Sequence, residues 1–212
     1  QWSGDDFYTD AFKVECCWLR GPTVDGVKRT LIPVSISFDK IQTFAWNQSL
    51  TAVEFISAID PLTIDPLVIQ ESAFRGTGIT SIEIPANVTF IGISSFSYSY
   101  SLTSVEFASG STLETIGESA FAWTPLVSIR IPASVTSIGK GAFEYAYSLV
   151  SVTFASASTL QTIGESAFRG TRLVVIEIPA SVISIGEGAF HDTTAMTQFT
   201  VDPGSTDFKT VD

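Results

Sequence analysis

Few residues of this chain could carry out catalytic chemistry. His191 is the only histidine, and no spacing in the sequence assembles a serine, histidine and aspartate arrangement for nucleophilic catalysis around it. Cys16 and Cys17 are the only cysteines, and adjacent Cα atoms lie about 3.8 Å apart, too close for an ordinary disulfide. A strained vicinal disulfide, an intermolecular bridge and two reduced thiols all remain open, whereas the spacing excludes a CxxC redox or zinc site. We therefore expect no catalytic site, no metal and no cofactor.

Aromatic residues recur at a fixed place and are the first candidates for binding. Four rings each lie two residues after a phenylalanine that itself recurs along the chain, and two tyrosines follow two residues further on. Amphipathic rings along an edge are typical of surfaces on which protein partners or sugar rings pack. The alternative is that these rings only cover one side of the core. The candidate binding edge consists of Trp46, Tyr98, Tyr100, Trp123, Tyr145 and Tyr147.

Acidic residues recur in register at one strand position that we expect to be exposed. Neighbouring turns of a stacked parallel structure lie about 4.8 Å apart, so like charges there repel by about 1 kcal/mol in water. Arg130 interrupts the row and relieves that repulsion. The row is either a solvated face with internal charge compensation or a docking strip for a basic ligand. It consists of Glu54, Glu83, Glu106 and Glu177.

Both asparagines of the chain lie in glycosylation sequons, Asn47-Gln48-Ser49 and Asn87-Val88-Thr89. We expect Asn87 in an exposed turn after an Ile-Pro pair, where a glycan has room. Asn47 instead aligns with a buried position of a repeating unit. We therefore predict glycosylation at Asn87 in preference to Asn47, provided that the source organism glycosylates its secreted proteins.

An internal repeat must position all of these residues. Without gaps, residues 102–148 match residues 149–195 at 31 of 47 positions, and a unit of 23–24 residues recurs within each copy. Such a period is the signature of a solenoid, in which each unit buries its apolar face only against its neighbours. Function is then expected on stacked surfaces and not in one catalytic pocket.

The spacing within a unit predicts strands and turns with little helix. In residues 128–131 apolar and polar side chains alternate, as on a half-buried strand. Pro132 follows and ends this strand, because proline has no N–H for the ladder. A second extended piece is expected at 136–138, and the recurring phenylalanine, for example Phe143, forms a second apolar ladder.

The combined I-P…V-x-x-I-G-x-x-A-F pattern resembles the BspA-like class of leucine-rich repeats over about residues 27–201. The resemblance implies a predominantly β, right-handed solenoid with parallel stacked strands, here of about eight units. It also implies an extracellular or cell-surface protein that serves adhesion and ligand binding without catalysis. One departure is the family's cysteine three residues after the phenylalanine, which small residues such as Thr124 and Ala146 replace. That side of the core could therefore be looser or wetter.

Composition limits the class of partner. The formal net charge of −11 argues against nucleic acid or an anionic membrane, and no apolar stretch approaches the ~18 residues of a membrane span. Residues 1–26 are expected to form an N-terminal capping segment, and residues 202–212 to begin a further repeat or form a tail. Because the chain opens at Gln1 without a signal peptide, we interpret it as a processed or trimmed product.

We therefore expect a secreted or cell-surface leucine-rich-repeat module for adhesion or macromolecular binding, with a protein or glycan as ligand. The alternative is a structural glycoprotein subunit that polymerises head to tail with copies of itself into a filament or surface layer. An open solenoid edge could support such a contact, since it presents unpaired strand groups.

Overall fold

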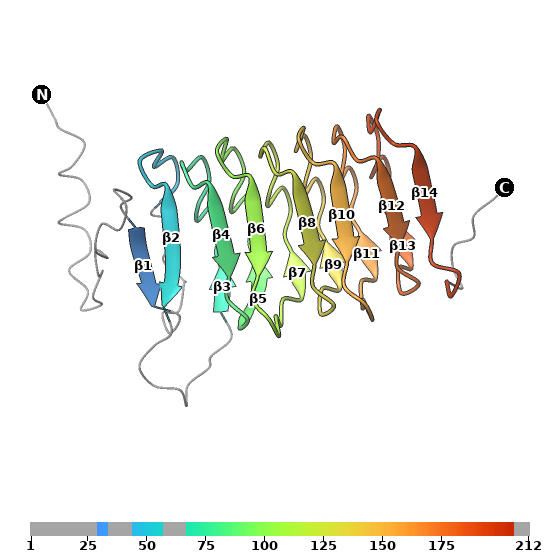
Figure 1. Ribbon diagram of the computed structural model, residues 1–212, viewed down its shortest axis with the longest axis horizontal. Helices are drawn as coiled ribbons and strands as arrows, with labels where there is room; N and C mark the ends of the chain where they lie inside the picture. Colours follow the sequence, from blue (N-terminus) through green and yellow to red (C-terminus); the bar gives the residue numbers. More distant parts are fainter. Residues whose placement is uncertain (1–28, 34–43, 57–66, 206–212) are drawn as a thin grey trace, which may run out of the picture.

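Short strands make up the regular structure of the residues that the computed structural model describes, which are 29–33, 44–56 and 67–205 (Figure 1). Every strand pairing among these residues is parallel, and they contain no helix. The structure thus confirms the expected parallel β-solenoid. The predicted capping segment 1–26, with Cys16 and Cys17, and residues 206–212 of the predicted tail lie outside the described residues.

Stacked strands form two faces of the solenoid, and the second face lies behind the first in the view of Figure 1. The first-face strands are β1 (Arg29–Pro33), β2 (Ala52–Ile56), β4 (Ser81–Ile84), β6 (Ser104–Phe107), β8 (Ser128–Ile131), β10 (Ser151–Phe154), β12 (Val175–Ile178) and β14 (Gln198–Val201). The second-face strands, which form one continuous sheet, are β3 (Leu67–Ile69), β5 (Val88–Ile91), β7 (Thr115–Ile116), β9 (Ser137–Ile138), β11 (Thr162–Ile163) and β13 (Ser184–Ile185).

Exposed and buried side chains alternate along the first-face strands, because the pleat of a β-strand points successive side chains to opposite sides. In β8, Ile129 and Ile131 are buried while Ser128 and Arg130 are exposed. The strands β4 and β12 repeat the same pattern. The inward residues of the first face and of the second face therefore share one continuous apolar core.

A column of phenylalanines runs through this core, one ring from each coil. From Phe44 to Phe190 the centroids of successive rings lie 5.2 to 5.6 Å apart and the ring planes are within 11° of parallel. The five central rings are fully buried: Phe74, Phe96, Phe121, Phe143 and Phe168. Stacked rings at this spacing add to the stabilisation that comes from burial alone.

In the turns that carry these rings, some backbone N–H groups form hydrogen bonds to the next coil and others form hydrogen bonds within the turn itself. The N–H of Phe121 donates to the carbonyl of Ala142 in the next coil at 2.8 Å, while the N–H of Ala122 donates back to Ser119 at 3.1 Å. Thr124 takes the place of the family's cysteine; it is buried, and its hydroxyl donates to the Phe121 carbonyl at 2.7 Å. The same hydrogen bond recurs at Thr77, Thr171 and Thr193. The expectation of a looser or wetter core on this side is therefore wrong.

The coils associate two by two along the first face. All four residues of β8 pair with all four of β10, and pairing is equally complete in β1–β2, β4–β6 and β12–β14. Between β10 and β12 only Ser151 and Val175 pair, and no pairing joins β2 to β4 or β6 to β8. We call these three openings of the first face seams.

A proline accompanies each seam. Within the β8–β10 pair, the N–H of Ala155 donates to the carbonyl of Ile131 at 3.0 Å. Pro179 holds the corresponding place after β12 and has no N–H to donate to the carbonyl of Phe154. Pro85 and Pro132 hold that place in the other two seams. Each seam therefore lacks the hydrogen bond that closes a coil pair at the carboxyl ends of its strands.

Candidate binding surface

The structure brings four of the predicted aromatic residues into one continuous row. The centroids of Trp46 and Tyr98 lie 6.1 Å apart, those of Tyr98 and Trp123 6.2 Å, and those of Trp123 and Tyr145 4.5 Å. Each ring belongs to the turn that leads into a first-face strand, so the row runs across the coils at the end where these strands begin.

An unusual backbone conformation holds these rings in place. Trp46, Tyr98, Trp123 and Tyr145 have φ values of 54° to 64°, in the left-handed region that favours glycine. Glycine does occupy the same position in the coil after Tyr145, where Gly170 has a φ of +68°, and a Cβ there would lie 2.5 Å from Cδ1 of Tyr145. The glycine therefore leaves room for the ring of the preceding coil.

Two arginines, Arg75 and Arg169, lie over rings of this row. The Cζ atom of Arg75 lies 5.4 Å from the centroid of Trp46 and 5.1 Å from that of Tyr98. The Cζ atom of Arg169 lies 5.6 Å from the centroid of Tyr145. A guanidinium over a ring face is attracted by the ring quadrupole. Rings of this row of four thus lie against neighbouring rings or against arginine.

Tyr100 and Tyr147 widen the row. Tyr100 packs edge-on to Tyr98, with centroids 6.1 Å apart and an interplanar angle of 73°. Exposed fractions are 59% for Trp46, 56% for Tyr100 and 46% for Tyr147. We call the six residues the aromatic edge, which keeps the membership predicted from the sequence.

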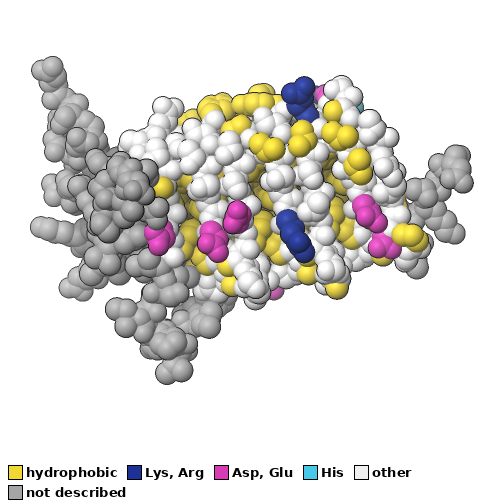
Figure 2. Space-filling view, viewed as in Figure 1, with side chains coloured by type: hydrophobic (Ala, Val, Ile, Leu, Met, Phe, Trp, Pro, Cys, Tyr) yellow, Lys and Arg dark blue, Asp and Glu magenta, His cyan; other side chains and the backbone are white. Residues whose placement is uncertain are grey.

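Sequence reasoning missed three valines that extend this apolar surface. Val127, Val150 and Val174 lie directly after the first ladder leucine of their coils and are 40% to 48% exposed. The N–H of Val150 donates to the carbonyl of Val127 at 3.0 Å, so they lie on adjacent coils. Other coils carry threonine at this position, and that change of residue type was the available signal. Figure 2 shows hydrophobic side chains gathered toward the end of the first face where the strands begin.

The predicted acidic row lies on the first face, with every member exposed, but it is not continuous. Glu83 and Glu106 lie opposite each other in the paired strands β4 and β6, and Glu54 projects from β2. Arg130 and Thr153 hold the next two places, so Glu177 is separated from the other three by two coils. Figure 2 shows acidic side chains in separate groups along this face.

The two sequons lie in different settings. Asn87 is half-buried in the turn between β4 and β5, and its carbonyl accepts a hydrogen bond from the N–H of Leu67 at 2.9 Å. Asn47 is also half-buried and not fully buried as its alignment suggested, and its Oδ1 accepts hydrogen bonds from the N–H and the hydroxyl of Ser49 at 3.1 and 2.7 Å. Glycosylation of Asn87 stays a prediction.

The described residues offer little for chemistry. His191 is exposed, and its Nδ1 lies 2.9 Å from Oδ2 of Asp192. Among residues 29–33, 44–56 and 67–205 no three histidine, cysteine, aspartate or glutamate side chains gather as metal ligands would. A search of the same residues finds no helix with the length and apolar character of a membrane span.

The repeat pattern carries the relationship to known proteins. A family model described as "BspA type Leucine rich repeat region (6 copies)" matches residues 67–203. The chain belongs to this family. The resemblance inferred from the sequence is therefore confirmed, and leucine-rich repeats of this family are generally non-catalytic. No curated protein matches the chain.

Solved structures include similar solenoids from bacteria. The pneumococcal vaccine antigen PcpA is 34% identical, with a TM-score of 0.58, over 59% of this chain and 31% of its own. A leucine-rich repeat protein from Bacteroides ovatus is 18% identical, with a TM-score of 0.55, over 85% of this chain and 62% of its own. A leucine rich cell surface protein from Faecalibacterium prausnitzii is 22% identical, with a TM-score of 0.45, over 81% and 60%. This BspA-type chain thus spans less than two thirds of the length of each.

Proposed function

We propose that this BspA-type repeat chain is a non-catalytic adhesion or binding module, secreted or at the cell surface, and that its aromatic edge docks a protein. The geometry of the rings supports a protein over a glycan. Stacking of a sugar requires a free ring face, whereas the faces in this row lie against other rings or against Arg75 and Arg169. The exposed aromatic residues together with the exposed valines suit the apolar side chains of a protein partner.

Family membership supports the extracellular location. The match to the BspA-type family covers most of the described residues. PcpA, the similar protein with the highest identity of the three above, is a vaccine antigen. The non-catalytic assignment is supported by the family, whose leucine-rich repeats are generally non-catalytic.

Because the chain repeats itself, a segment of the aromatic edge can be replaced by the corresponding segment of the later repeat. Such a variant loses part of the aromatic edge and introduces no sequence from another protein. Residues 144–148, Glu-Tyr-Ala-Tyr-Ser, correspond to residues 191–195, His-Asp-Thr-Thr-Ala, one repeat later. Asp192 holds the place of Tyr145 and has nearly the same backbone, with φ values of 60° and 54°. Replacing 144–148 by the later sequence removes Tyr145 and Tyr147 while keeping a turn that this fold already forms.

Binding of this swapped variant to immobilised extracellular-matrix proteins and to a glycan array tests the proposal. Loss of two interface aromatics is expected to weaken protein binding by at least about ten-fold. Ile93→Ser is the matched control, because Ile93 is 44% exposed but lies outside the aromatic edge, and it should leave binding unchanged. Binding to glycans alone, or equal binding by the swapped variant, would contradict the proposal.

Head-to-tail assembly is a second candidate function, favoured by one observation. Phe199 lies on β14, the outermost described strand of its sheet, and is 41% exposed. We infer that, if copies polymerise, this ring lies in the contact between them. Light scattering across a concentration series should then show growing particles that Phe199→Ser abolishes, and a monomer at all concentrations would exclude the filament.

A further inference from the structure

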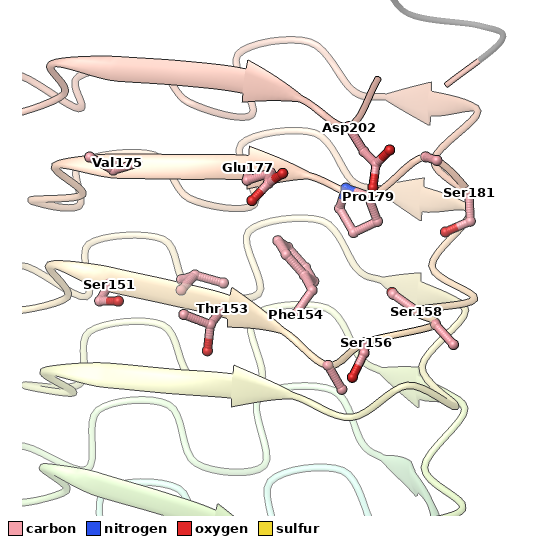
Figure 3. A pocket seen from close by; sticks show the side chains of 14 residues that line it. Ser151, Thr153, Phe154, Ser156, Ser158, Val175, Glu177, Pro179, Ser181 and Asp202 are labelled. Carbon is pink, nitrogen blue, oxygen red and sulfur yellow. The ribbon is translucent and has the colours of Figure 1, made fainter. Parts of the chain in front are cut away.

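The seam between β10 and β12 opens into a groove that runs along these two strands of the first face (Figure 3). Its volume is about 570 Å³, which is within the range of small-ligand sites. Phe154 lies between the two coils, and Glu177 and Asp202 lie across the opening from it. The groove follows β10 from Ser151 to Phe154 and includes no residue of the aromatic edge.

Apolar side chains, hydroxyls and two carboxylates line this groove. Because Pro179 has no N–H, the carbonyl of Phe154 receives no hydrogen bond from the next coil. The hydroxyl oxygen of Ser181 is buried and has no hydrogen-bond partner among the described residues. In the preceding repeat the equivalent Ser134 donates to the carbonyls of Ser111 and Leu113 at 3.0 and 2.8 Å. The hydroxyl of Ser181 thus lacks the hydrogen-bond partners that Ser134 has.

Two carboxylates give the groove a negative charge that no cation of the described chain neutralises. Glu177 is exposed, and neither it nor Asp202 forms an ion pair with a described lysine or arginine. Asp202 is half-buried and accepts one hydrogen bond, from the N–H of Gly204 to its Oδ1 at 2.8 Å. Carboxylates of this kind recognise ammonium or guanidinium groups, whose charge strengthens each hydrogen bond.

We propose that the β10–β12 groove binds a basic side chain, of the arginine or lysine class, presented by a protein partner. The half-buried ring of Phe154 supplies an apolar wall for the aliphatic stem of such a side chain and a π-face for its charged end. Glu177, Asp202 and the carbonyl of Phe154 receive its donors. This assignment is independent of what the aromatic edge binds.

The equivalent seam between β6 and β8 serves as an internal comparison. Its backbone opens in the same way, and Pro132 follows β8 as Pro179 follows β12. Its charges differ, however, because Arg130 stands in place of Glu177 and Ala155 in place of Asp202. That seam should reject a basic side chain. The third seam, between β2 and β4, has Glu83 in place of Glu177 but Ala108 in place of Asp202, so only the β10–β12 seam combines both carboxylates.

Calorimetric titration of the whole chain with the tripeptide Gly-Arg-Gly, and with its neutral citrulline counterpart, tests the assignment. We expect saturable binding of one arginine peptide per chain and at least about ten-fold weaker binding of the citrulline peptide, as expected for loss of a charge-assisted contact. Glu177→Gln and Asp202→Asn should each weaken arginine binding by about five-fold or more. Glu177 is exposed, so its substitution leaves the fold intact.

Glu83→Gln is the matched control. Glu83 occupies the same strand position on β4 and is also exposed, and its substitution by glutamine changes the net charge by the same amount. It should alter arginine binding by less than about two-fold, because a distant surface charge is screened by salt. No saturable binding of the arginine peptide, or an equal effect of Glu83→Gln and Glu177→Gln, would overturn the proposal.

Discussion

Removal of one ring from the phenylalanine column should destabilise the solenoid, and two substitutions separate the loss of ring stacking from the cost of a cavity. Phe143 is fully buried, with its centroid 5.4 Å from that of Phe121 and 5.2 Å from that of Phe168. Phe143→Leu largely fills the space but loses both stacked contacts, at about 0.5–1.5 kcal/mol each, so we expect a loss of about 1–3 kcal/mol. Phe143→Ala also leaves a cavity, and its total loss should reach about 3–5 kcal/mol.

Urea denaturation followed by circular dichroism measures both steps, with the slope of the transition checked for each variant. Lys140→Ala is the control, because the 2.9 Å ion pair of Lys140 with Glu165 is exposed on both sides, and its midpoint should not move measurably. Phe190→Ala should have a smaller effect than Phe143→Ala, since Phe190 is only partly buried and has one stacked neighbour. Equal shifts for Phe143→Ala and Lys140→Ala would refute the assignment of inward and outward residues.

Four other outcomes follow from the structure. Ala157 has a φ of 59° where the preceding repeat has Gly110 at 76°, so Ala157→Gly should stabilise and Gly110→Ala destabilise the chain by about 1 kcal/mol each in urea titrations. Thr124→Val keeps the side-chain shape but loses the buried hydrogen bond to the ladder phenylalanine, and the same titration should show a loss of about 1–2 kcal/mol. The hydrogen bond of Lys140 to Glu165, and then the charge of that carboxylate, raise the pKa of Lys140 above its ordinary value, so an NMR titration of the Lys140 Cε signal should have its midpoint above that of a free lysine. Glycopeptide mass spectrometry of native material should find sugar on Asn87, and sugar on the other sequon alone would contradict the alignment of the first repeat.

The strands and the core could be predicted from the sequence because they depend on local periodicity. Alternation in residues 128–131 determines which side chains face inward, and the structure buries Ile129 and Ile131 as expected. The offset of two residues from each ladder phenylalanine likewise placed Tyr98 and Trp123 on one edge. Residues with the same offset in the sequence lie at the same place in successive coils, because every coil repeats the same path.

The seams and the orientation of the rings could not be predicted in the same way, because both depend on contacts between coils. Pro179 is visible in the sequence, but its effect on the Phe154 carbonyl requires the register of β12 against β10. The ring of Tyr145 occupies the space above Gly170 only because both residues have a left-handed backbone. A periodic pattern gives the position of a side chain within its coil but not the direction in which a ring leans across coils.

Differences between the two copies of the repeat connect the fold to the proposed surfaces. Of the 47 aligned positions, the 31 identical ones include the ladder phenylalanines and the core isoleucines, so both copies supply the same residue types to the core. Half of the remaining positions lie in the turns 122–125 and 144–148, which carry the aromatic edge. Another difference exchanges Arg130 for Glu177 beside a seam. Because the coils stack through their identical residues, these surface positions can differ without altering the coil path. Binding specificity in this solenoid should therefore depend on where the copies differ, namely at the aromatic edge and in the charges beside the seams.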